Sequence, residues 1–184
     1  MTDETRAALS QASAALAAAR ENAERAKESC LEQIAADLPS RAAESARRVA
    51  TAQPEVTKKL GKDGVATMRA ALKTASEELG LQLIAAKDEI DWPLGTRYKK
   101  IENWHIRGAL FNTFHRRTGA LSAVLSDSGY KLDVSDPFLP QYLYTESTLS
   151  KVAGALSALG AAIERLDAAK RADDNSTVDE IWGL

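Results

Sequence analysis

The strongest constraint on the fold is the composition of the first 91 residues, which contain no aromatic side chain and are about one-quarter alanine. Alanine has the highest helix propensity, and its small side chain lets helices pack closely. Nine of the ten aromatic residues instead lie between Trp92 and Tyr144, together with both histidines. Aromatic side chains supply large apolar surfaces to cores and binding sites. We therefore expect a helical framework whose specific activity resides in an aromatic-rich central segment.

A long helix is predicted at the N-terminus, beginning after Thr2 and ending near Leu38, because Pro39 disfavours helical continuation. Two series recur there every seven residues: Leu9, Leu16, Ala23 and Cys30, and Ala12, Ala19 and Ala26. This spacing describes a narrow seam suited to close antiparallel packing. Two interpretations follow, a coiled coil that dimerises or the longest helix of a single bundle.

The middle of the chain contains further helical patterns. Pro54 suits the first turn of a helix. Another helix is predicted from Asp63 to Gly80 by the apolar series Val65, Met68, Leu72, Ala75 and Leu79. Residues 91–95, Asp-Trp-Pro-Leu-Gly, predict a break. A helix with apolar residues on two faces is predicted over residues 100–125, and residues 126–145 are expected to form a long loop that lies across the bundle or makes one wall of a groove.

The clearest helical pattern lies near the C-terminus. Two apolar series recur every seven residues there: Leu149, Leu156 and Ile163, and Val152, Leu159 and Leu166. Gly154 and Gly160 flank this seam and would let a neighbouring backbone approach closely. After Arg171 the sequence becomes polar, so we divide the chain into a helical bundle domain (1–171) and a polar spacer with an apolar C-terminal tail (172–184).

These patterns predict an all-α fold. No alternation of apolar and polar residues long enough for a strand is found. We expect an antiparallel bundle of five or six helices, with a long alanine-rich N-terminal helix beside the C-terminal helix and an aromatic-rich central segment.

Composition places limits on the cellular setting. The chain has 184 residues, a net charge of −2 and one cysteine, which excludes an internal disulfide. Its first residues lack the basic and apolar pattern of a secretion signal, and no apolar run is long enough for a membrane span. We therefore expect a cytoplasmic protein. The high alanine and arginine content is typical of a GC-rich bacterial genome.

The residues offer little that is typical of an enzyme. Glu102 and His105 share a helical face, as metal ligands of four-helix di-iron proteins do, but the other ligands of such a site are missing. Cys30 lies in the alanine-rich seam and is interpreted as a buried thiol, and Asp133 and Asp136 suit a turn. No phosphate-binding glycine loop or nucleophile motif is present. We expect no catalytic residue, no metal and no cofactor.

The leading hypothesis is therefore a non-enzymatic protein–protein interaction or assembly module, such as an adaptor, a scaffold or a regulatory subunit. Abundant apolar helical seams combined with little chemistry favour it. A protein partner or a homo-oligomer is expected, contacted through helical faces and an aromatic groove. The candidate partner-binding residues are Trp92, Tyr98, Trp104, Phe111, Tyr142, Tyr144 and Trp182.

The alternative hypothesis is nucleic-acid binding through the basic segment 97–117. This segment has six basic residues and one acid, Glu102. Basic side chains neutralise phosphates, and Trp104 or Tyr98 could stack on a base. The candidate residues are Arg97, Lys99, Lys100, Arg107, Arg116 and Arg117.

Overall fold

The computed structural model describes residues 3–96, 100–115, 117–132 and 145–182. Within these ranges the chain is all-α, as predicted, with five α-helices, one 3-10 helix and no β-strand. The elements in chain order are α1 (Asp3–Ala52), α2 (Pro54–Ala85), η1 (Lys87–Glu89), α3 (Asn103–His115), α4 (Gly119–Asp127) and α5 (Glu146–Trp182).

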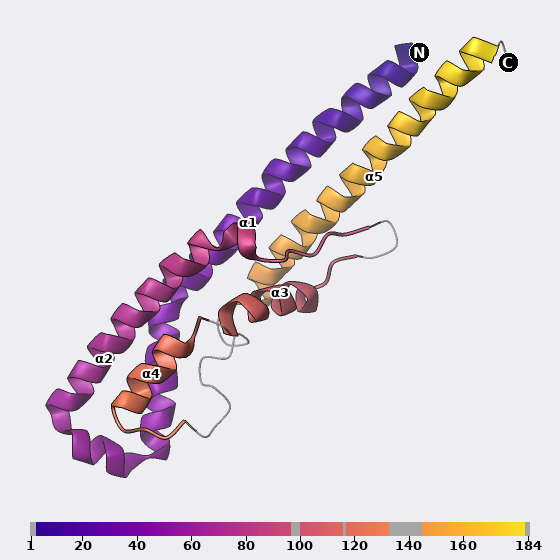
Figure 1. Cartoon of the computed structure of the whole chain (residues 1–184). Helices are drawn as coiled ribbons and strands as arrows, with labels where there is room; N and C mark the ends of the chain where they lie inside the picture. Colours follow the sequence, from indigo (N-terminus) through magenta and orange to yellow (C-terminus); the bar gives the residue numbers. More distant parts are fainter. Residues whose placement is uncertain (1–2, 97–99, 116, 133–144, 183–184) are drawn as a thin grey trace.

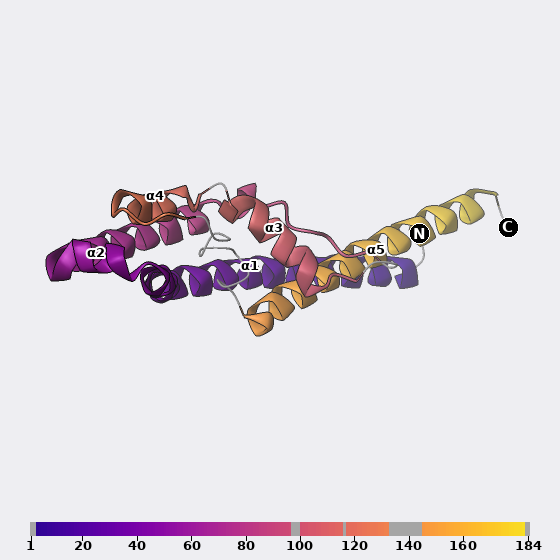
Figure 2. The ribbon, with the colours of Figure 1, turned by 90° about the horizontal axis from the view of Figure 1, so that it is seen from below.

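The molecule is elongated, and α1 is its longest helix (Figure 1, Figure 2). α2 runs antiparallel along the second half of α1, and α5 runs antiparallel along the first half (Figure 1). α3 contacts α5, and α4 contacts α2. The first turns of α1 and the last turns of α5 lie at the same end of the molecule (Figure 1). The predicted antiparallel bundle is confirmed, including the side-by-side packing of the N-terminal and C-terminal helices.

The predicted end of the first helix at Leu38 is wrong, because α1 continues through Pro39 for another 13 residues, from Ser40 to Ala52. A proline inside a helix removes one backbone hydrogen bond and crowds the preceding turn. The buried face continues across this position, since Leu38 is 0% exposed and Ala42 is 1% exposed. Burial of this face in the core therefore outweighs the local effect of the proline.

α2 begins with Pro54 in its first turn, as predicted, where the missing N–H of proline is not needed. Gly61 interrupts the helix with a φ of 65° and a ψ of −174°. Residues with a side chain rarely adopt a positive φ, so glycine divides α2 close to the predicted start at Asp63. The helix passes Gly80 because Leu83 is fully buried one turn later.

The predicted break at residues 91–95 is confirmed, and this segment lies against α5. A Cβ atom on Gly160 would overlap the carbonyl group of Gly95, and a Cβ atom on Gly95 would lie 2.9 Å from the Cα of Ser157. Glycine at both positions therefore permits the close backbone approach that was predicted at Gly160. A Cβ atom on Gly154 would have no neighbour within 4 Å.

The single helix predicted over residues 100–125 is wrong, because the segment forms α3 and α4 with a turn between them. The backbone N–H groups of Arg117 and Thr118 both donate to the carbonyl oxygen of Phe114 (2.8 and 3.0 Å) and close this turn. The turn directs α3 onto α5 and α4 onto α2. The buried apolar residues of this segment therefore meet two different helices, whereas Trp104 and Phe111, on the other predicted apolar face, stay exposed.

The core lies where α1 meets both α2 and α5. Each fully buried large apolar side chain contributes roughly 1.5–3 kcal/mol to stability. Tyr130 is also buried, and its hydroxyl forms a hydrogen bond with the hydroxyl of Thr57 (2.9 Å). The largest fully buried side chains are Leu31, Ile34, Leu38, Leu72, Leu83, Ile106, Leu110, Phe114, Leu121 and Leu125.

α5 continues beyond Arg171 to Trp182, so residues 172–182 of the predicted spacer and tail are helical. The side chains of residues 179–182 and the last two residues lie outside the description, and the division at residue 171 stays a prediction. No helix in the described ranges is long and apolar enough to cross a membrane.

Candidate functional site

The solvent-facing side of α3 is the strongest candidate for a functional surface. Ile106, Leu110 and Phe114 point into the core and are 0% exposed. On the opposite side, Trp104 is 62% exposed and Phe111 is 39% exposed. Aromatic surface left in water on one helix face is typical of a contact surface for another molecule.

Four exposed residues form one stripe along α3, which we call the α3 outer face: Trp104, Gly108, Phe111 and His115. Their spacings of four, three and four residues place them on the same side of the helix. The rings of Phe111 and His115 stack with centroids 5.3 Å apart and an interplanar angle of 11°. A Cβ atom on Gly108 would have no neighbour within 4 Å, so the stripe is flat between its two aromatic ends.

The ring of Trp104 is held in place by its neighbours. It stacks on His105, with centroids 3.5 Å apart, and its Nε1–H donates to the carboxylate of Glu102 (3.0 Å). The backbone N–H of Glu102 donates to Nδ1 of His105 (3.2 Å), so a neutral His105 carries its proton on Nε2. The Nε2 atom is buried without a hydrogen-bond partner. Trp104 is therefore exposed and yet held in one orientation.

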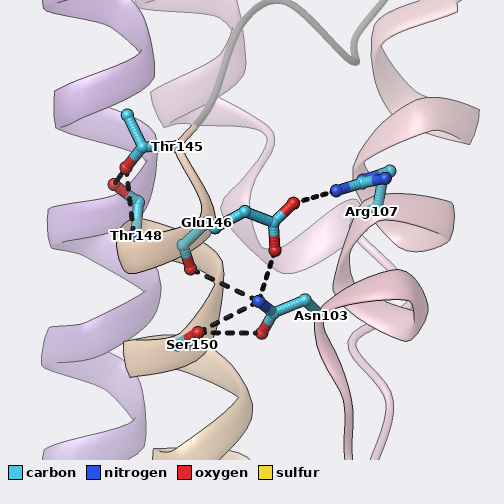
Figure 3. Close-up of polar contacts among 6 residues, drawn as sticks. All are labelled: Asn103, Arg107, Thr145, Glu146, Thr148 and Ser150. Atoms are coloured by element: carbon cyan, nitrogen blue, oxygen red, sulfur yellow. Dashed lines mark hydrogen bonds and ion pairs between the residues drawn. The ribbon is translucent and has the colours of Figure 1, made fainter.

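A groove of about 570 Å³ lies beside Trp104, between the start of α3 and the start of α5. Figure 3 shows the polar contacts that connect these helices. The side-chain amide of Asn103 donates to the carboxylate of Glu146 (2.6 Å) and to the hydroxyl of Ser150 (3.0 Å). Arg107 forms an ion pair with the same carboxylate of Glu146. This network connects α3 to α5 and keeps the walls of the groove together.

The basic segment is partly neutralised by acids of the same chain. Arg107 pairs with Glu146, and Arg117 pairs with Glu89 (2.7 Å). Lys100 lines the groove and has no ion pair with any described residue. Exposed ion pairs contribute at most about 1 kcal/mol, so a charged partner can displace them. The predicted nucleic-acid contacts Arg97, Lys99 and Arg116 lie outside the described residues.

The structure brings two of the seven candidate partner-binding aromatics, Trp104 and Phe111, onto one surface. Trp92 instead packs against the core. Its Nε1–H donates to the carbonyl oxygen of Lys87 (2.9 Å), and Nζ of Lys27 lies 6.0 Å from its ring centroid. Tyr98, Tyr142, Tyr144 and the side chain of Trp182 lie outside the described residues.

Two surface features were not anticipated from the sequence. Leu81 is 70% exposed and Ile84 is 41% exposed on α2. Both residues fall outside the apolar series predicted for that helix. This mismatch is the signal in the sequence that could have indicated their exposure. A second groove, of about 530 Å³, lies at the kink of α2 and is lined by Lys58, Lys62 and Arg69. The close spacing of these basic residues in the sequence could have indicated a basic surface there.

The residues that the sequence analysis considered for enzyme chemistry are His105, Cys30 and the acidic side chains. In the part of the chain that the structure describes, no group of three or more His, Cys, Asp or Glu side chains could hold a metal ion. Nδ1 of His105 already accepts a hydrogen bond from the backbone of Glu102. Cys30 is 1% exposed, and burial raises the pKa of its thiol to about 11, which suppresses the nucleophilic thiolate at neutral pH. Asp133 and Asp136 lie outside the described ranges.

Comparisons with protein-family models, with curated proteins and with solved structures find no match to this chain. An all-α bundle supports many unrelated functions, so the fold alone does not specify one. The functional argument therefore depends on the α3 outer face and the groove beside Trp104.

Proposed function

We propose that this chain is a non-enzymatic protein–protein interaction or assembly module, whose partner binds the α3 outer face and the adjacent groove. The exposure of Trp104 carries this proposal, because the same ring is held by His105 and Glu102. A side chain that is already ordered loses little conformational entropy on binding. Tryptophan also ranks among the residues that contribute most to the free energy of protein interfaces.

The surface favours a partner segment that carries apolar and acidic side chains. Trp104 and Phe111 offer apolar contacts two helical turns apart. Lys100 lines the groove without an ion pair among the described residues, and the exposed pair of Arg107 with Glu146 can open. A helix laid along the outer face would contact both aromatic rings at once.

Affinity capture with matched variants tests this proposal. The double variant Trp104→Ala/Phe111→Ala removes the aromatic surface, and Leu81→Ala/Ile84→Ala removes comparable exposed apolar surface from α2 as a control. We expect a protein that wild type and the control retain and the first variant does not. Calorimetry with this purified protein should then give a Kd weakened by about 30-fold, which corresponds to about 2 kcal/mol.

Circular dichroism must first establish that both variants keep the helical fold. If wild type retains no protein, or if both variants retain the same proteins equally well, the α3 outer face is not a partner-binding surface and the proposal is wrong.

Nucleic-acid binding is the second candidate function, and the exposure of Trp104 beside Lys100 and Arg107 favours it, because a base can stack on that ring. Fluorescence anisotropy with a single-stranded oligonucleotide tests it. This candidate predicts an affinity that falls steeply with salt and is lost in the double variant Arg116→Glu/Arg117→Glu. Absence of binding at low salt would eliminate it.

A further inference from the structure

Both histidines of this chain stack on the two exposed aromatic rings of the α3 outer face. His105 stacks on Trp104 with centroids 3.5 Å apart, and His115 stacks on Phe111 with centroids 5.3 Å apart. Histidine is the side chain that ordinarily changes its charge between about pH 5 and pH 8. Each aromatic contact of the surface therefore adjoins a group that can gain a proton in mild acid.

The hydrogen bond of His105 requires a neutral imidazole. Its Nδ1 accepts the backbone N–H of Glu102 (3.2 Å). A protonated imidazole carries a hydrogen on both nitrogens and has no acceptor left. In acid, two N–H groups would face each other at this contact, so the hydrogen bond is lost and the ring has to turn.

The position of His105 in α3 acts in the same direction. α3 begins at Asn103, so His105 is its third residue. Glu or Gln at this position commonly accepts the N–H of the residue that precedes the helix, and the neutral imidazole does the same here. The N-terminus of a helix also carries a partial positive charge, which opposes a cationic side chain. A proton on His105 therefore removes a cap and adds an unfavourable charge.

The new N–H of a protonated His105 can use an acceptor that now holds Trp104. The carboxylate of Glu102 accepts the Nε1–H of Trp104 (3.0 Å). An imidazolium attracts a carboxylate through its charge, which a neutral indole does not. A cation is also attracted to the face of an indole, but this attraction does not restore the hydrogen bond of Trp104. Protonated His105 and Trp104 therefore compete for Glu102.

The other charges near Trp104 leave this balance to Glu102. α5 is the helix that packs against α3, and it contributes Glu146 to the groove. The remaining charged residues of the groove are Lys100, Glu102 and Arg107. Arg107 is paired with Glu146. Two acids and two bases surround the groove, so no excess of either charge fixes the protonation of the nearby imidazole.

We propose that a proton on His105 releases Trp104 from its present orientation, and that binding of a partner to the α3 outer face therefore weakens in mild acid. This inference rests on the proposed function, because it concerns regulation of the same surface. A released side chain loses more conformational entropy when it is ordered in an interface. The acid form of the protein is thus the weaker binder.

His115 provides a matched control on the same helix. Its ring has no hydrogen bond to any described residue, so a proton breaks none there. It is the last residue of α3, where the partial negative charge of the helix end favours a cation. A cationic ring also remains attracted to the phenyl ring of Phe111. Protonation of His115 is therefore expected to keep its contact.

Nuclear magnetic resonance of the isotope-labelled full chain tests the release without a partner. The indole N–H signal of Trp104 is assigned by its loss in Trp104→Phe. Its order parameter should fall from about 0.85 at pH 7.5, the value of a rigid group, to below about 0.6 at pH 5.5. Carboxylates remain ionised across this range.

Two variants identify the titrating group in this measurement. His105→Gln keeps an acceptor for the N–H of Glu102 at every pH, so its order parameter should not fall in acid. His115→Gln should show the same fall as wild type. An order parameter that is equal at both pH values in wild type would overturn the inference, as would a fall that persists in His105→Gln.

Calorimetry with the captured partner tests the consequence for binding. An ordinary imidazole is about 90% protonated at pH 5.5, so a surface that binds only in its neutral form should show a Kd about tenfold weaker than at pH 7.5. The ratio of the two Kd values should match wild type in His115→Gln and lie about tenfold lower in His105→Gln. Equal ratios in wild type and His105→Gln would overturn the regulation.

Failure of this inference can be distinguished from failure of the proposed function. If no partner is captured at pH 7.5, the proposed function is wrong, and the order parameter of Trp104 still decides whether His105 controls this ring. If a partner binds equally well at both pH values, the proposed function stands and the regulation by His105 is wrong.

Discussion

At the scale of single residues, burial controls the chemistry of Cys30. Its thiol is 1% exposed, and burial raises its pKa from 9.0 to about 11. A shift of this size lowers the thiolate fraction about 100-fold at neutral pH. We expect Ellman's reagent at pH 8 to modify the native protein at least about 100-fold more slowly than the protein in guanidinium. Equal rates in both conditions would show that the thiol is accessible.

Two glycines of α5, Gly160 and Gly154, allow a comparison of the same substitution in a tight and in an open environment. A Cβ atom on Gly160 would overlap the carbonyl group of Gly95, whereas a Cβ atom on Gly154 meets nothing within 4 Å. We expect Gly160→Ala to lower the free energy of unfolding by about 1–3 kcal/mol through this overlap. Gly154→Ala should raise it by up to about 1 kcal/mol, because alanine favours the helix.

Urea denaturation of both variants measures these changes. Equal effects of the two substitutions would mean that residues 91–95 do not press against α5 at Gly160.

At the scale of elements, a cluster of charges connects η1 to α1. Nζ of Lys87 lies 2.7 Å from the carboxylate of Glu28 and 3.4 Å from that of Glu24. Lys27 also bonds to Glu24 (2.7 Å). The pKa of Glu24 is lowered from its ordinary 4.5, first by the hydrogen bond from Lys27 and further by Lys87. The pKa of Lys87 is raised, chiefly by its hydrogen bond to Glu28.

These shifts set the pH range in which the cluster stabilises the fold. The lowered pKa of Glu24 gives stability that is present above about pH 4.5 and is lost as the pH falls through the folded-state pKa. The raised pKa of Lys87 gives stability that is lost only in strongly alkaline solution. We expect Lys87→Met to lower the Tm at pH 7, and this difference from wild type should disappear at about pH 3.

Lys151→Met, at an exposed lysine of α5, is the control for this prediction and should leave the Tm unchanged at both pH values. If the effect of Lys87→Met persists in acid, ion pairing is not its cause.

At the scale of the whole molecule, stability is distributed unevenly along α1. One face of residues 30–46 is buried in the core, whereas Figure 1 shows only α5 beside the first turns of α1 among the described residues. Hydrogen exchange follows local stability. Amides of residues 8–20 should exchange about tenfold or more faster than amides of residues 30–46.

Much of the fold was predictable because helix formation follows local patterns. The seven-residue series identified α5, Pro54 marked the first turn of α2, and residues 91–95 marked a break. Local signals failed at Pro39 and within residues 100–125. The proline is tolerated because its neighbours are buried, and the central segment bends because the buried residues of α3 and those of α4 pack towards different helices.

The candidate site was predictable only in part. The clustering of aromatics pointed to the central segment, and their spacing placed Trp104 and Phe114 on different faces of a helix, but it did not show which of the two faces would stay in solvent. No sequence pattern connects Asn103 with Glu146 and Ser150, because these residues are more than 40 positions apart and meet only when α3 packs on α5.

The sequence by itself determined that this protein is helical and which faces of its helices are apolar, because alanine content and residue spacing act over a few turns. Only the tertiary structure decided how far α1 extends, where α3 ends and which aromatic rings remain in solvent. Those outcomes depend on contacts between segments that are distant in the chain, and the burial energy of these contacts exceeds the local preferences.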